Sequence, residues 1–145
     1  MFRNRWVVGA AALIAGGGIA TAVGVLPALG QSSPPSSPVI LGSTAQLTAK
    51  GAGAYPFAYV ACSPGSFASL SISLSEKVGK GIASGSGSTD VTCNGEIETI
   101  TIPVSATGKA FSKGTAFGQA TLFSCGPSFC GSTTVSGNVK LTTKR

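Results

Sequence analysis

The 145-residue sequence contains no histidine. Histidine is the side chain that titrates near neutral pH, and proton transfer in Ser-His-Asp and Cys-His sites depends on it, as do many metal sites. None of these sites can be assembled from this chain. Among the remaining side chains, the serines are the best candidates for a nucleophile.

Acidic residues are scarce too, because the whole chain has four. Glu96 and Glu98 are close in sequence and are expected to share one face of a solvated strand. A glycosidase needs its two carboxylates on facing elements across a cleft, so this pair does not fit that chemistry. The serines are numerous, but none lies in a G-x-S-x-G or S-x-x-K motif. We therefore expect a protein that is not an enzyme, with no catalytic residue and no cofactor.

Charged residues make up only 10% of the chain, and basic ones predominate, with a formal net charge of +6. Without Arg3 and Arg5, eight basic and four acidic residues remain, which is a net charge of +4. The basic residues are spread along the chain, whereas nucleic-acid-binding proteins concentrate them on one element or face. The sequence predicts no nucleic-acid partner. Its charge suits a solubilising surface that tolerates an anionic cell wall or membrane.

Residues 1–30 have the pattern of a secretory signal peptide. Arg3 and Arg5 form a short basic start, and a long uncharged run rich in Ala and Gly follows. Cleavage is expected before Gln31, with a cut after Ala22 as the alternative. The run is also long enough to span a bilayer, so an uncleaved chain would stay associated with the cell envelope. Its proline and glycines favour cleavage, which predicts a secreted, extracellular protein with no stable membrane insertion.

The rest of the chain divides into two parts. Residues 31–38 are a Ser- and Pro-rich linker that is expected to be disordered. Residues 39–145 suit one domain, which we expect to be monomeric. We expect seven or eight short strands in this domain at roughly ten-residue spacing, which predicts an all-β, antiparallel β-sandwich with Greek-key connections. A small barrel is the alternative.

The clearest strand pattern lies at residues 67–75. Leu70, Ile72 and Leu74 alternate with serines, so the three apolar side chains are expected at the centre of a core. By contrast, the glycines in residues 82–90 favour only a weak strand or a loop.

Four cysteines in an exported chain predict two disulfides, for which three pairings exist. Cys125 and Cys130 flank a Gly-Pro turn and are expected to pair, which leaves Cys62 to pair with Cys93. The rival interpretation is a metal site. Zinc sites use close pairs such as C-x2-C, and these spacings do not supply them, so no metal is expected.

Three aromatic residues, Tyr55, Phe57 and Tyr59, alternate along another predicted strand. If Cys62 points inward, Ala58 and Val60 share its face and the aromatic side chains point the other way. Either the linker or a neighbouring loop covers them, or a bulge near Pro56 changes the parity of the strand, or they form an exposed patch. An exposed apolar patch often marks a binding surface, so these three are the candidate binding residues.

The order of motifs from residue 58 to residue 141 carries a resemblance. A strand ends in Cys-Ser-Pro-Gly, a Ser-alternating strand and a Gly-rich strand lead to Val-Thr-Cys, and a Thr-Ile-Pro-Val strand precedes Phe-Ser-Cys-Gly-Pro-Ser-Phe-Cys-Gly. This resembles small secreted actinobacterial proteins with immunoglobulin-like sandwiches and no assigned activity. The resemblance implies fold and export, and it supplies no active residue.

A second resemblance is to the neocarzinostatin-type apoproteins, which are secreted sandwiches with two disulfides that carry an enediyne. The spacing of Cys125 and Cys130 supports it, whereas the first cysteine pair is much farther apart here than in that family. Two functions therefore follow as expectations. The first is a non-enzymatic module that binds an unknown extracellular or cell-wall partner, and the alternative is a carrier of an apolar small molecule.

Overall fold

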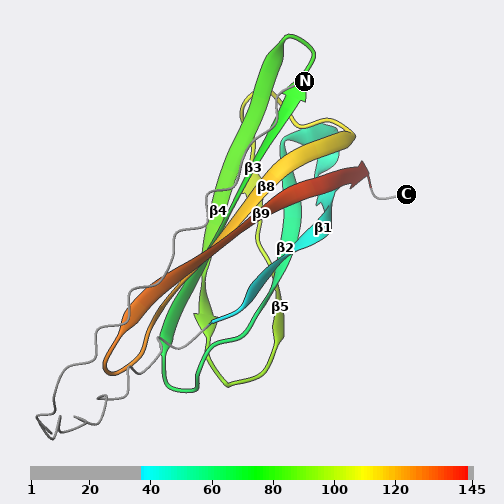
Figure 1. Cartoon of the computed structure of the whole chain (residues 1–145). Coiled ribbons are helices and arrows are strands. Elements are labelled where there is room, and N and C mark those ends of the chain that lie inside the picture. Colours follow the sequence, from blue (N-terminus) through cyan, green and yellow to red (C-terminus); the bar gives the residue numbers. More distant parts are fainter. Residues whose placement is uncertain (1–36, 144–145) are drawn as a thin grey trace, which may run out of the picture. The chain divides into compact units, whose positions relative to one another are not determined.

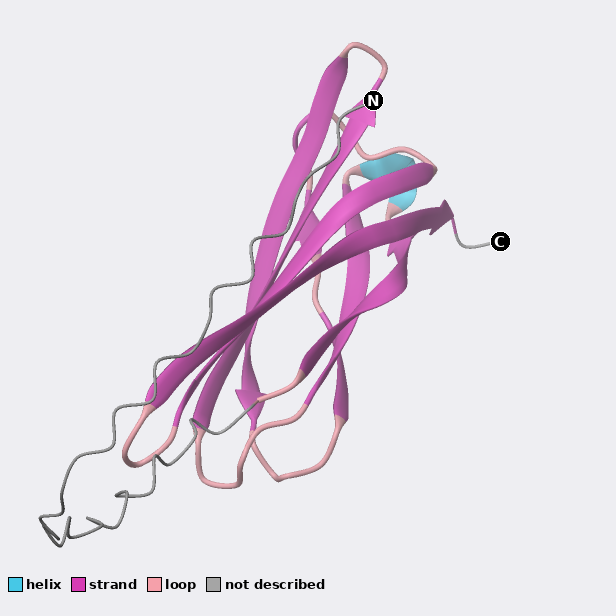
Figure 2. Ribbon diagram, viewed as in Figure 1, coloured by secondary structure: helices cyan, strands magenta, loops and turns pink. Residues whose placement is uncertain are grey.

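A computed structural model describes residues 37–143 of the chain. The predicted signal peptide at 1–30 and most of the predicted linker at 31–38 lie outside the described residues. The all-β prediction is confirmed, because the described part contains strands and a single three-residue 3-10 turn but no α-helix (Figure 2). In chain order the elements are β1 (Val39–Leu47), η1 (Ala49–Gly51), β2 (Gly53–Val60), β3 (Phe67–Val78), β4 (Gly81–Thr92), β5 (Glu98–Thr101), β6 (Val104–Ser105), β7 (Thr107–Gly108), β8 (Gly114–Cys125) and β9 (Cys130–Thr143).

The strands form one curled sheet in the order β5-β2-β1-β9-β8-β3-β4-β7, and β6 pairs with β2 off this path. The sheet has nine strands, which exceeds the expected seven or eight because it includes two strands, β6 and β7, of only two residues each. The long strands β3, β4, β8 and β9 lie together in Figure 1, and β1, β2 and β5 lie beside them. Side chains of β2 and β3 meet in the same core although three strands separate them in the sheet, so the sheet curls around its own apolar face.

One strand pair departs from the antiparallel prediction. β1 is antiparallel to β2 but runs parallel to β9, with Thr44 opposite Lys140 and Leu47 opposite Thr143. No tight turn joins β1 to β9, so nothing in the local chain forces them to run in opposite directions. β1 also shifts register against β2 between Leu41 and Ala45, as a bulge does.

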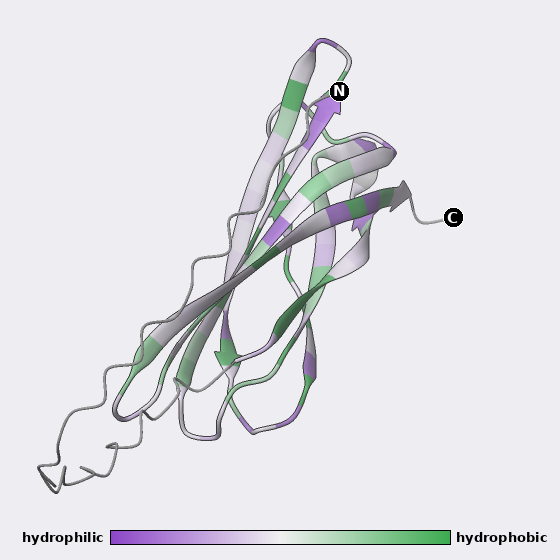
Figure 3. Cartoon of the chain, viewed as in Figure 1, coloured by the Kyte–Doolittle hydropathy of each residue, from purple (hydrophilic) through white to green (hydrophobic). Residues whose placement is uncertain are grey.

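The core has two adjacent halves, and Leu41 packs against both. Leu70 and Ile72 belong to the first half, and Leu74 belongs to the second. All three are 0–2% exposed, which confirms the predicted alternation of residues 67–75. Most of the ribbon in Figure 3 is nevertheless pale, because Ser, Thr and Gly occupy the outward positions of these strands.

The strand β3 continues beyond the predicted stretch to Val78. The same alternation places Glu76 on the inward side, where it is only 5% exposed. Its carboxylate accepts two hydrogen bonds, from the Ser112 backbone N–H at 2.8 Å and from the Ser112 hydroxyl at 3.0 Å. A buried carboxylate needs such partners, and both oxygens have one. Glu76 therefore holds the segment before β8 onto the end of the sheet.

The two disulfides join Cys62 to Cys93 and Cys125 to Cys130, as the spacing predicted. The first bond links the segment after β2 to the segment after β4, across 31 positions of sequence. The second closes the turn between β8 and β9, whose pairing runs up to the two cysteines themselves.

The expectation of a weak strand or loop at residues 82–90 was wrong. β4 pairs with β3 along its whole length, and the glycines serve close packing and not flexibility. Gly85 and Gly87 face inward where the Pro103–Ser105 segment crosses β4. A β-carbon on Gly87 would collide with the backbone carbonyl of Pro103, and one on Gly85 with that of Ser105. Glycine in a strand is typical of such an approach by another backbone.

Gly87→Ala is therefore expected to lower the free energy of unfolding by about 1–3 kcal/mol, the usual cost of overpacking. The methyl group can be accommodated only if the segment containing Pro103 moves. Denaturant unfolding measures the loss, and Ser88→Ala, at an exposed position next to it, is the matched control. A Gly87→Ala variant as stable as the wild type would show that the crossing segment does not lie against β4.

Candidate functional site

The aromatic stripe, defined as Tyr55, Phe57 and Tyr59, lies on the outward face of β2. Ala58 and Val60 on the same strand are buried, which confirms the predicted parity. The tyrosines are 46% and 41% exposed, and Phe57 is half-buried. Of the predicted alternatives, covered or exposed, the two tyrosines are exposed.

Neighbouring strands supply the surroundings of the aromatic stripe. On the β1 side, Ile40 is opposite Tyr59 and Gln46 is opposite Tyr55. On the β5 side, Thr101 is opposite Phe57. Directly opposed side chains on one face of a sheet are close enough to interact. The stripe is thus flanked by an exposed isoleucine and by uncharged polar side chains.

The Phe57 ring lies on the backbone of β1. A β-carbon on Gly42 would lie 2.6 Å from the Phe57 ring, so only glycine leaves room for it there. Phe57 also meets Tyr59 edge to face, with ring centroids 5.5 Å apart and planes at 87°. Edge-to-face packing of this kind is favourable for aromatic pairs. The Phe57 ring, the middle one of the stripe, therefore packs against the backbone of Gly42 and against the ring of Tyr59.

A groove of about 320 Å³ lies beside these rings, lined by Thr44, Gln46, Tyr55, Phe57 and Thr101. We call it the β2 groove. The Tyr55 ring also lines a second hollow of about 420 Å³, whose other residues include Thr48, Pro103 and Ser105. Tyr55 therefore lines two hollows.

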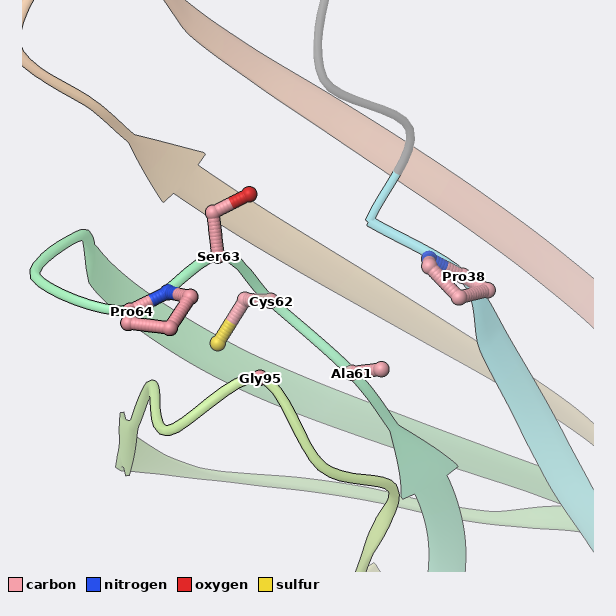
Figure 4. Close-up of a pocket in the computed structure, with 6 residues that line it drawn as sticks. All are labelled: Pro38, Ala61, Cys62, Ser63, Pro64 and Gly95. Atoms are coloured by element: carbon pink, nitrogen blue, oxygen red, sulfur yellow. The ribbon is translucent and has the colours of Figure 1, made fainter.

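Two further hollows lie elsewhere. One, of about 270 Å³, is lined by Pro38, Ala61, Cys62, Ser63, Pro64 and Gly95, where the chain enters β1 and the first disulfide is anchored (Figure 4). Its walls carry no titratable side chain. The other, of about 390 Å³, lies over β3, β4 and β8 and is lined by serines, Thr107 and the exposed ring of Phe117.

The carboxylates do not converge on any of these hollows. Glu96 lies in the loop before β5, so only Glu98 is in the strand, and the expectation that they share a strand face was wrong. Asn94 bonds to both residues, since its side chain accepts a hydrogen bond from the Glu96 backbone N–H at 2.8 Å and donates one to the Glu98 carboxylate at 2.6 Å. These bonds brace the loop that follows Cys93. Within residues 37–143, no three His, Cys, Asp or Glu side chains are grouped as metal ligands.

Sequence reasoning identified the stripe but missed Gly42, Thr44, Gln46 and Thr101, which complete the site. Their contribution depends on the register of β1 and β5 against β2. No local pattern in the sequence indicates that register.

No helix within residues 37–143 is long and apolar enough to cross a membrane. Comparison of the sequence with protein-family models and with curated proteins finds no match.

Proposed function

We propose that this chain is a secreted, non-enzymatic β-sandwich module that binds an extracellular or cell-wall partner through the aromatic stripe. The observation that carries the proposal is the exposure of Tyr55 and Tyr59 on a sheet face beside an open groove. Aromatic side chains with one apolar and one polar end are enriched at binding surfaces.

The strand order supports an immunoglobulin-like sandwich as the finer description of the fold. In that fold the first, second and fifth strands share one sheet, and the third strand lies in the other sheet with the last two. Here β1, β2 and β5 are neighbours, and β3 lies beside β8 and β9. The fourth strand differs, because β4 pairs with β3, as the added strand of the variable-type fold does. The two disulfides indicate folding in an oxidising compartment, which supports secretion of the domain.

The carrier alternative needs a deep apolar cleft, and the hollows described above are open and partly lined by hydroxyl groups. Native mass spectrometry of protein from the culture medium separates the two functions. A retained small molecule would favour the carrier, whereas a mass equal to that of the disulfide-bonded polypeptide fits the binding module.

Tyr59→Ser is expected to weaken binding to purified cell walls of the producing organism while costing only about 0.5–1.5 kcal/mol of stability, the worth of one aromatic pair. Tyr59→Phe keeps the ring and its contact with Phe57, so it is the matched control. Sedimentation with the walls measures binding, and thermal unfolding measures stability. Wall binding that is the same for wild type and Tyr59→Ser, or absent in both, would contradict a role for the stripe. A loss of stability as large as that of a core substitution would show that the ring acts in packing.

A further inference from the structure

The β2 groove carries hydrogen-bonding groups that residues 37–143 leave unused. Thr44, Thr101 and Tyr55 present hydroxyls, and Gln46 presents an amide. Within residues 37–143 none of these four side chains makes a hydrogen bond to another protein group. They are available to a ligand.

Some polar side chains elsewhere on the sheet are hydrogen-bonded within the protein. On the face of β3, β8 and β9, the Thr121 and Thr134 hydroxyls pair at 3.0 Å, and the Ser71 hydroxyl donates to the Thr121 carbonyl at 3.4 Å. The Thr48 hydroxyl, in the hollow beyond Tyr55, is bonded to Gly53 at 2.7 and 3.0 Å. The β2 groove combines polar side chains without such bonds with the exposed Tyr55 ring and the half-buried Phe57 ring.

No charged side chain lines the β2 groove. The nearest charge in the sheet register is Lys140 of β9, which is opposite Thr44 and lies outside the lining. Apart from Lys140 at the Thr44 end, the groove offers no charge to an ionic ligand, whereas its hydroxyls and amide suit a neutral one that is rich in hydrogen-bonding groups.

We propose that the β2 groove binds a neutral saccharide chain. A sugar ring presents C–H groups on its faces and hydroxyls around its rim, which match the aromatic stripe and the flanking Thr and Gln side chains respectively. The groove is open, and Tyr55 also lines a second hollow, so a ligand longer than one sugar ring could contact both. This inference rests on the proposed function and names the chemical class of its partner.

The groove is too small to be by itself an interface with a folded protein. Five residues line it, whereas a standard protein interface involves about 20–30 residues on each side. It also lacks arginine, which is enriched at such interfaces. The Phe57 ring packs against Gly42 and Tyr59, and such preorganisation lowers the entropic cost of binding.

The test is a binding titration of the disulfide-bonded domain against defined oligosaccharides. One set is neutral and contains hexose, pentose and N-acetylhexosamine oligomers, and the second set is acidic. Binding to at least one neutral oligosaccharide is expected, and Tyr55→Ala is expected to weaken it about tenfold, which corresponds to the loss of one aromatic stacking contact. Thr44→Val, which removes a hydroxyl at constant shape, is expected to weaken it less.

Phe117→Ala is the matched control, since it removes an exposed ring from the serine-lined hollow over β3, β4 and β8. It is expected to leave binding unchanged. Loss of binding in Phe117→Ala but not in Tyr55→Ala would overturn the placement of the site. Failure of every neutral oligosaccharide to bind, or binding of acidic ones only, would overturn the saccharide proposal. In that case, if sedimentation with cell walls is still weakened by Tyr59→Ser, the proposed function holds and its partner belongs to another chemical class.

Discussion

Replacing Cys62 and Cys93 together by alanine is expected to lower the free energy of unfolding by about 3.7 kcal/mol. The bond closes a loop across 31 positions of sequence, and the loop-entropy relation gives this figure for a loop of that length. A small domain has a total stability of about 5–15 kcal/mol, so the loss is a large fraction of it. Equilibrium denaturation in urea, analysed with a constant m-value, measures the change.

The matched control is the double replacement of Cys125 and Cys130. That bond closes a span of only 5 positions, and the same relation gives about 2 kcal/mol. Its strands also pair up to the cysteines, so the turn is already restrained without the bond. A larger loss from the second pair than from the first would contradict the entropic account. Non-reducing peptide mapping tests the pairing itself, and a peptide linking Cys62 to Cys125 would overturn it.

Ile72→Ala is expected to cost about 2–5 kcal/mol, the range found for removing most of a large aliphatic side chain from a packed core. Ile72 is fully buried between Ala120 of β8 and Gly87 of β4, neighbours too small to expand into the space. Ile72→Leu keeps the volume and is expected to cost less than about 1.5 kcal/mol. The midpoint of denaturant unfolding gives both values.

The control for Ile72 is its outward neighbour Ser71, whose side chain makes one long hydrogen bond to the Thr121 carbonyl at 3.4 Å. Ser71→Ala is expected to change stability by about 0.5 kcal/mol or less, as at most surface positions. Equal damage from Ser71→Ala and Ile72→Ala would mean that the two faces of β3 have been exchanged.

Local alternation was enough to orient the strands that matter most. The serines between Leu70 and Leu74 fix the inward face of β3, and Ala58 and Val60 do the same for β2. Since side chains alternate with a period of two, one known inward residue orients the whole strand. That is why the outward direction of Tyr55 and Tyr59 could be predicted before their neighbours were known.

Features that depend on distant segments could not be predicted in this way. Gly85 and Gly87 look unfavourable for a strand until the crossing segment at Pro103 is in place, because the reason for glycine lies in another part of the chain. The parallel β1–β9 pair likewise reflects long-range packing. The burial of Glu76 could have been predicted, however, since the alternation of β3 continues through it to Val78.

The candidate site shows the same division between local and distant information. One strand supplies the aromatic stripe, which the sequence displays directly. The polar groups of the β2 groove come from β1 and β5, and their alignment with Phe57 depends on the register shift between Leu41 and Ala45. A bulge of this kind follows from how the sheet closes and leaves no clear mark in the local sequence.

The pairing of β1 with β9 has a consequence for the order in which the domain can fold. Thr142 donates to the Ala45 carbonyl across 97 positions of sequence, so β1 is synthesised long before its partner exists. The hairpins β3–β4 and β8–β9 close over short turns and can form early. Pairing β1 with β9, by contrast, requires closure of the loop formed by the whole intervening chain. Until β9 is complete, the β9-facing edge of β1 exposes unpaired backbone groups that could join strands of another molecule. A chain exported in extended form would meet this hazard only after translocation, and the speed of the last docking step would then set how much protein escapes aggregation.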